Sequence, residues 1–299
     1  MSSDLGKHVR RLHFGPAGKP VGFRGRVEEV PKALSEMKLD ALEVQQVRNI
    51  NIKEEQAKKI REEAKKYKII LSVHGPYAVN LSSGKDEIIK NSKDRLLRVL
   101  KVAELMGAYV VVFHPGYYKD LGKEDSLKKA IKVLLEIEEE AKSLGIKRVK
   151  LGAETTGKKT QLGDLDEVIS MAQETDIVIP VIDFAHLHAR MGGGFTKKRE
   201  YDEVLDKLEE QVSDKIKRLH IHFSKIEYTD KGEKRHHTFG SGYGPMFHPL
   251  SEALLERGIE AVIISESPVL EKDALRMKEI SERIAFKKYN NKKELMKLE

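Results

Sequence analysis

Short apolar runs alternate with longer amphipathic stretches along the chain. The runs are rich in Val and Ile and do not alternate strictly between apolar and polar residues, which is typical of parallel strands buried on both faces. They cover residues 11–14, 41–44, 69–73, 109–113, 149–153, 178–182, 218–221 and 261–264. Between them, apolar residues recur at helical spacing, most clearly at 53–66, 88–106 and 126–144. The pattern therefore predicts alternating strands and helices.

Eight strand–helix pairs in 299 residues predict an α/β protein built as a single-domain (β/α)8 TIM barrel. The alternative is a doubly wound open sheet, because periodicity alone does not reveal whether a sheet closes. No Pro-rich or Ser-rich linker divides the chain. We therefore expect one domain over residues 1–299, with a barrel core at about 11–285 and a basic tail at 286–299.

Composition narrows the function classes. The chain has no apolar run of the roughly 18 residues that a membrane span needs, and residues 1–11 lack the apolar segment of a secretory signal. We therefore expect a cytoplasmic protein without a membrane partner. There is no cysteine, so any metal site must use His, Asp and Glu. The net charge of +7 mildly favours a polyanionic partner.

Polar residues end six consecutive predicted strands. These residues, at or near the carboxyl ends, are His74, His114, Glu154, Asp183, His220 and Glu266. The carboxyl ends of barrel strands share one face, where the active sites of this fold lie. Any one of the six has an ordinary explanation as a helix cap or a hydrogen-bonded histidine. Together they would be costly as unpaired charges, and divalent cations would neutralise the carboxylates and bind the imidazoles.

Two local motifs add candidate ligands. Asp183-Phe184-Ala185-His186 places His186 on the first turn after the sixth strand, and Arg235-His236-His237 follows the seventh strand. The second motif has the alternative interpretation of a solvated basic turn. We expect His13, His188, His222 and His237 to lie behind the ligands or on the surface.

In combination, these motifs resemble the endonuclease IV family, the metal-dependent apurinic/apyrimidinic endonucleases of the xylose-isomerase-like group of barrels. The order and approximate spacing agree from residue 11 to about 285. The segments that carry the resemblance are His74-Gly75-Pro76-Tyr77, Asn80-Leu81, Phe113-His114-Pro115-Gly116, Ala153-Glu154-Thr155-Thr156-Gly157, Asp183-Phe184-Ala185-His186, Leu219-His220, Arg235-His236-His237 and Glu266-Ser267-Pro268.

The resemblance implies a cluster of zinc ions at the carboxyl face of the barrel. By position, it assigns His74 and His114 to the first ion, with Glu154 as the bridge to the second. It assigns Asp183, His220 and Glu266 to the second ion, and His186 and His236 to the third. Glu154 and Glu266 are the residues on which catalysis would depend.

The implied reaction is hydrolysis of the phosphodiester 5′ to an abasic site in duplex DNA, by a monomer that needs no protein partner. Tyr77 and Arg48 resemble the family's DNA-contacting residues.

The chain departs from the family pattern near the third ion. The family usually has Asp two residues before the histidine that matches His236, and here that position is Lys234. Glu233 would substitute for the Asp if the loop shifts by one residue. The family's Asn-Asp after the strand-seven histidine is also changed, to His222-Phe223. We therefore expect two or three zinc ions, as the resemblance implies.

Two other functions remain open. A sugar isomerase or epimerase of the same barrel group would hold one divalent ion with Glu154, Asp183, His220 and Glu266. That reaction gives no joint role to the other four candidate histidines, which are His74, His114, His186 and His236. A non-catalytic barrel that binds nucleic acid or a partner through its basic tail would have no need of converging metal ligands.

Overall fold

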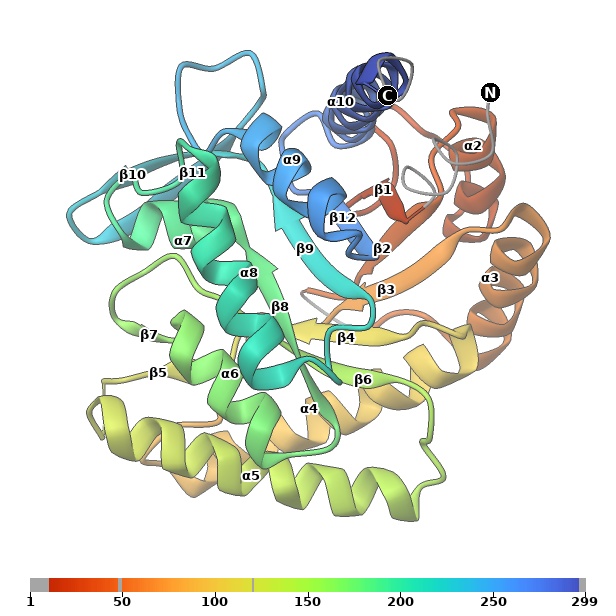
Figure 1. The fold of residues 1–299 in the computed structure, drawn as a ribbon. Helices are drawn as coiled ribbons and strands as arrows, with labels where there is room; N and C mark the ends of the chain where they lie inside the picture. The colour runs from red at the N-terminus through yellow and green to blue at the C-terminus, as the bar shows by residue number, and fades with distance from the viewer. Residues whose placement is uncertain (1–10, 48–49, 120, 296–299) are drawn as a thin grey trace.

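The computed structural model describes residues 11–47, 50–119 and 121–295, and their main sheet has eight parallel strands surrounded by helices (Figure 1). The strands lie in the order β1-β12-β9-β8-β6-β4-β3-β2. They are β1 (Leu12–Pro16), β2 (Ala41–Gln45), β3 (Ile70–His74), β4 (Val110–Phe113), β6 (Lys150–Glu154), β8 (Val178–Asp183), β9 (Leu219–Phe223) and β12 (Ala261–Ser265).

Every one of these strands falls on a predicted run, and the TIM barrel prediction is confirmed. Each strand pairs with its neighbours in chain order, whereas the order reverses in a doubly wound sheet. The ring closes between β1 and β2, where Ala17 forms a parallel bridge with Glu43. The N–H of Asp40 also donates to the carbonyl oxygen of Phe14, at 3.2 Å.

Helices connect the strands on the outside of the ring. They are the 3-10 turn η1 (Val27–Glu29) and helices α2 (Val30–Glu36), α3 (Glu54–Tyr67), α4 (Asp86–Met106), α5 (Lys123–Ser143), α6 (Leu165–Glu174), α7 (Phe184–Arg190), α8 (Lys198–Val212), α9 (Phe247–Arg257) and α10 (Glu271–Leu295). Helix α4 ends where the sequence predicts, at Gly107, whose φ of +75° is available to glycine at little cost. Helix α10 continues to residue 295, so it includes most of the segment predicted as a basic tail.

Two small antiparallel pairs lie at the carboxyl end of the barrel. One joins β5 (Gly116–Tyr117) to β7 (Gln161–Leu162), and the other joins β10 (Lys225–Thr229) to β11 (Gly232–His237). The second pair packs against α7, the short helix that follows β8. These elements form the rim around the carboxyl ends of the strands.

The barrel interior changes from apolar to polar along its length. On β4, Val111 and Phe113 pack in the large core shared with the helices, whereas Val110 and Val112 form a separate cluster with β8 residues. Side chains on a strand alternate between two faces, so His114 continues the interior series of Val110 and Val112. The apolar interior therefore gives way to ionisable side chains near the carboxyl ends.

None of the helices in the described part of the chain combines the length and apolar composition needed to cross a membrane.

Candidate metal centre

The predicted site residues converge where the strands end. His74, Glu154 and Asp183 are the last residues of β3, β6 and β8. His114 directly follows β4 and Glu266 directly follows β12. The side chains at the strand ends are buried, and those of His114 and Glu266 are partly exposed at the rim. The strand ends thus bring residues far apart in sequence to one place.

A first group surrounds one oxygen of Glu154. The Nε2 atoms of His74 and His114 lie 3.4 Å and 2.9 Å from Glu154 Oε2. Neither His114 Nε2 nor Glu154 Oε2 makes a hydrogen bond of acceptable geometry, although both atoms are buried. Buried polar atoms are almost always hydrogen-bonded. Two such atoms facing each other fit a site for a shared cation.

A second group lies around the other oxygen of Glu154. His222 Nδ1 is 3.0 Å from Glu154 Oε1 and 3.3 Å from Glu266 Oε1. Asp183 Oδ1 accepts a 2.7 Å hydrogen bond from the backbone N–H of His186 and so caps α7. Its second oxygen, Oδ2, is buried without a hydrogen bond. Asp183 therefore serves as a helix cap and still offers one oxygen to a cation.

The strand-nine histidine beside this group is His222 and not His220. In the sheet, His222 pairs with Asp183, whereas His220 pairs with Val181, two residues further from the mouth. His220 Nε2 lies 3.0 Å from Glu43 Oε2, and its Nδ1 lies 2.5 Å from the Tyr109 hydroxyl. That His220 is a ligand remains a prediction. The geometry favours His222 as the ligand from this strand, although the sequence predicts that His222 lies behind the ligands or on the surface.

A third group combines His186, His236 and Glu266, each of which offers one atom within 4.8 Å of the others. Glu233 joins it, because its Oε2 lies 3.1 Å from His186 Nε2. Lys234 instead points outward, where its Nζ pairs with Glu227 Oε1 at 2.6 Å. The Lys side chain that stands at the expected Asp position is thus directed away from the group.

A β-bulge explains how Glu233 reaches the site. In the β10–β11 pair, Glu227 is opposite Arg235, but the next residue, Tyr228, is opposite Glu233. Lys234 is the extra residue of the bulge, and an extra residue exchanges the faces of the residues on one side of it relative to those on the other. Glu233 therefore lies on the same face of the hairpin as His236. This is the one-residue shift that the sequence left open.

Hydrogen bonds hold three of the histidines with Nε2 directed away from the backbone. The Nδ1–H of His74 donates to the carbonyl oxygen of Gly75, and that of His186 donates to the carbonyl oxygen of Thr155, each at 2.9 Å. His236 Nδ1 lies 2.7 Å from Ser224 Oγ, whose own hydroxyl donates to the carbonyl of Lys225. A bond at one ring nitrogen leaves the other as the metal ligand.

The carboxylates perturb one another. Burial alone would raise the pKa of Glu154, but the neighbouring imidazoles together, chiefly through the charges of His114 and His222, hold this pKa well below its ordinary range. Burial raises the pKa of both Asp183 and Glu266, and the charge of Glu154 contributes to the rise in each case. Such crowding of like charges is typical of sites that bind cations.

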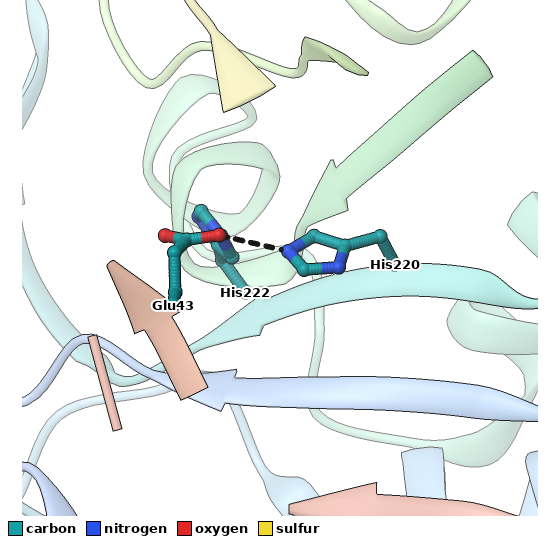
Figure 2. A group of neighbouring side chains, drawn as sticks. All are labelled: Glu43, His220 and His222. Carbon is teal, nitrogen blue, oxygen red and sulfur yellow. Dashed lines mark hydrogen bonds and ion pairs between the residues drawn. The ribbon is translucent and has the colours of Figure 1, made fainter. Parts of the chain in front are cut away.

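Two residues near the centre were missed or misplaced at the sequence level. Glu43 and His222 are fully buried and face each other, with His220 beside them (Figure 2). The sequence contains a signal for each of these two residues. His220 and His222 are two residues apart on one strand and therefore share a face, and Glu43 is a charged residue inside the apolar run 41–44.

Of the two predicted DNA-contacting residues, Tyr77 is among the described residues, and its contact with DNA stays a prediction. Tyr77 lies at the mouth and is 54% exposed, with its ring centroid 5.3 Å from that of His74 and 5.9 Å from that of His114. Desolvation at the mouth, followed by the charge of Glu266, raises the pKa of Tyr77 to about 12. Arg48 lies outside the described residues.

The residues present fit divalent cations. The donors are imidazole nitrogens and carboxylate oxygens, which suit zinc and similar ions. Three of the buried atoms left without a hydrogen bond belong to the centre: His114 Nε2, Glu154 Oε2 and Asp183 Oδ2.

The family model for the xylose isomerase-like TIM barrel matches residues 31–286. The chain belongs to this family. A family relative, the uncharacterized protein MJ0133 of Methanocaldococcus jannaschii, is 35% identical over 88% of the chain and 94% of its own length. The probable endonuclease 4 of Shouchella clausii is 29% identical over 57% of the chain and 58% of its own length.

Solved structures of two kinds share the family fold. Endonuclease IV from Thermus thermophilus matches with a TM-score of 0.69 and 19% identity, over 93% of this chain and 99% of that one. A D-tagatose 3-epimerase-like protein matches with a TM-score of 0.68 and 23% identity, over 88% of this chain and 94% of that one. At these identities the likeness establishes the fold alone, so function must be argued from the site.

Proposed function

We propose that this family member is a zinc-dependent endonuclease that hydrolyses the phosphodiester 5′ to abasic sites in duplex DNA. The observation that carries the proposal is the number of adjoining ligand groups. Glu154 belongs to two groups and Glu266 to two, and the third group gains Glu233 through the bulge. A cluster of cations is what hydrolysis of a phosphodiester uses to stabilise the attacking and leaving oxygens.

The residues would divide the work as follows. His74 and His114 would hold one ion, Asp183 and His222 a second, and His186, His236 and Glu233 a third. Glu154 and Glu266, which each belong to two groups, would contribute to more than one of these sites, and turnover would depend on them. When bound, the ions would polarise the phosphodiester and lower the pKa of the attacking water.

The rim suits a polyanionic substrate. The loops at 17–26 and 75–85 follow β1 and β3 at the carboxyl face, and they carry four Lys or Arg residues and no Asp or Glu. Cationic side chains around a site bind the phosphates of duplex DNA without reading its sequence. Tyr77 stands at this rim with an exposed ring, which suits insertion beside an extruded abasic sugar.

One observation supports a second candidate, a sugar epimerase or isomerase. Glu154, Asp183 and Glu266 each offer an oxygen within one small group, and His222 Nδ1 contacts two of these three carboxylates. Four such ligands are sufficient for a single divalent ion beside a small sugar. This interpretation gives no role to His236 and Glu233.

The deciding experiment is incision of a duplex that carries one stable abasic analogue, with and without EDTA, alongside elemental analysis of the same preparation. We expect nicking 5′ to the lesion that EDTA abolishes, no nicking of the intact duplex, and about two or three zinc ions per chain.

Absence of incision together with about one divalent ion per chain would contradict the proposal. Interconversion of ketohexoses by the same preparation would then establish the epimerase hypothesis.

A further inference from the structure

Glu43 is a fully buried carboxylate that the proposed ligand set does not use. It extends from β2 into the barrel and is approached by His220 and His222 of β9 (Figure 2). Burying a carboxylate is costly unless its oxygens are hydrogen-bonded. The contacts of Glu43 therefore indicate what it does there.

Those contacts satisfy Glu43 without a cation. Its Oε2 lies 3.0 Å from His220 Nε2, 3.1 Å from His222 Nε2 and 3.1 Å from the Ser72 hydroxyl, which donates to it. Its Oε1 accepts from the Gln45 side chain at 3.3 Å. Unlike Glu154 Oε2 and Asp183 Oδ2, neither oxygen of Glu43 is left without a hydrogen bond. Glu43, His220 and His222 also lie closely enough to hold a cation, but hydrogen bonds already account for both oxygens of Glu43.

His220 has a settled orientation within this network. If its Nε2–H donates to Glu43, its Nδ1 is the acceptor, and the Tyr109 hydroxyl donates to it at 2.5 Å. Both ring nitrogens of His220 are then occupied, and neither is available to a metal ion. His220 supports Glu43 from the side away from the metal centre.

His222 is oriented in the opposite sense to His74 and His186. His74 and His186 donate from Nδ1 and present Nε2, whereas His222 places Nδ1 beside Glu154 and Glu266 and Nε2 beside Glu43. A neutral imidazole has one N–H, so only one nitrogen can bind a metal. A hydrogen-bond acceptor beside Nε2 would keep the proton on Nε2, and Nδ1 would then be the nitrogen that binds the metal.

The geometry points to Glu43 as the positioning residue that fixes His222 in its Nε2–H tautomer and so presents Nδ1 to the metal centre. This inference rests on the metal centre proposed above. Glu43 would accept the hydrogen bond from Nε2–H of His222, just as backbone carbonyl oxygens accept the hydrogen bonds from Nδ1–H of His74 and His186. Its two oxygens are themselves held by His220, Ser72 and Gln45, so the ring of His222 is fixed in angle as well as in tautomer.

The test is zinc affinity of the metal-stripped full chain, measured by competition with a chromophoric chelator, with ions counted by elemental analysis. We expect Glu43→Gln to weaken one ion by about 10- to 100-fold, as loss of a partner behind a ligand typically does, and to leave the others unchanged. The Gln side chain is isosteric, and its amide can donate to His222 Nε2, which favours the wrong tautomer.

Glu138→Gln is the matched control, because Glu138 is also a buried, hydrogen-bonded carboxylate but lies on α5 and accepts from the N–H groups of Asp176 and Ile177. It should leave zinc affinity unchanged. Unchanged affinity in Glu43→Gln would overturn the inference. Complete loss of one ion in both Glu43→Gln and His220→Gln would also overturn it, because Glu43 and His220 would then be ligands themselves.

A second measurement does not depend on the variant folding. In the zinc-loaded wild-type chain labelled with ¹⁵N-histidine, His222, assigned with a His222→Gln variant, should carry its proton on Nε2. A proton on Nδ1 would overturn the inference. If the wild-type chain binds no divalent ion, the proposed function fails with it, whereas normal incision with an Nδ1 proton overturns the role of Glu43 alone.

Discussion

Asp183 combines a structural role and a candidate functional role in one side chain. One carboxylate oxygen caps α7, and the other lies in the candidate metal centre without a hydrogen bond, 3.4 Å from His186 Nδ1. The ordinary interpretation of an acidic residue after a strand, as a helix cap, and the functional one are therefore both supported by the same side chain. A motif that offers two explanations does not always require a choice between them.

His220 and His222 show where sequence reasoning was insufficient at this scale. The pattern places both on one face of a strand, but it does not tell which of them is level with Glu154. That level depends on the stagger between β8 and β9, in which Asp183 pairs with His222. Stagger is a property of the assembled sheet, so the strand was predictable and the residue was not.

A residue-scale prediction concerns pH and Glu138. Burial would raise the pKa of Glu138, but Lys142 and the N–H groups of Ile177 and Asp176 hold it below its ordinary value of 4.5. The ionised form therefore stabilises the folded state above pH 4.5, and this contribution is lost as pH falls through the lower folded-state pKa. Glu138→Gln should reduce the free energy of unfolding by about 1–2 kcal/mol at pH 7.

Urea unfolding at a series of pH values from neutral downward checks this prediction, because the difference from wild type should shrink below pH 4.5. Glu139→Gln is the control. Glu139 also contacts Lys142, at 3.0 Å, but its side chain is 76% exposed, so its loss should have little effect. A difference that stays constant with pH would contradict the assignment.

At the scale of elements, the bulge in the β10–β11 hairpin decides which acidic residue faces the candidate metal centre. Glu233 faces His186, and Lys234 is directed outward with 59% of its side chain exposed. If the third group binds an ion, Glu233→Gln should weaken that ion by about tenfold or more and leave the others. Lys234→Ala should change no ion.

Zinc titration of the two single variants beside the wild-type chain is the measurement. Weakening by Glu233→Gln matched by an equal strengthening in Lys234→Ala would mean that the effect is one of net charge at the rim, because the two substitutions change that charge in opposite directions. No weakening by Glu233→Gln would show that this residue is not a ligand. The bulge itself was not predictable from sequence, because an extra residue in one strand is visible only against its partner.

At the scale of the whole molecule, the fold was the most predictable feature. Eight apolar runs became eight strands because each is long enough and apolar enough to be buried on both faces. Closure was not predictable, because it depends on how β1 meets β2. Their backbones approach closely, and a Cβ on Gly15 would lie 1.9 Å from the carbonyl oxygen of Ala41.

We therefore expect Gly15→Ala to destabilise the barrel by about 1–3 kcal/mol or more, because the seam between β1 and β2 must open to admit a methyl group. Thermal unfolding followed by circular dichroism is the measurement. Gly242→Ala is the control, since a Cβ there would meet no atom within 4 Å. Equal melting temperatures for the two variants would show that the seam is pliable.

The bulge also has a consequence for how relatives of this chain are compared. Compared with the Asp position that the resemblance implies, the acidic residue of this chain, Glu233, lies one place earlier in β11, and the extra residue Lys234 leaves it directed at His186. A comparison made column by column would score this position as the replacement of an acid by a base, and would report a lost ligand. Homologues should therefore be grouped by hairpin length and stagger before any of them is judged to lack a metal site.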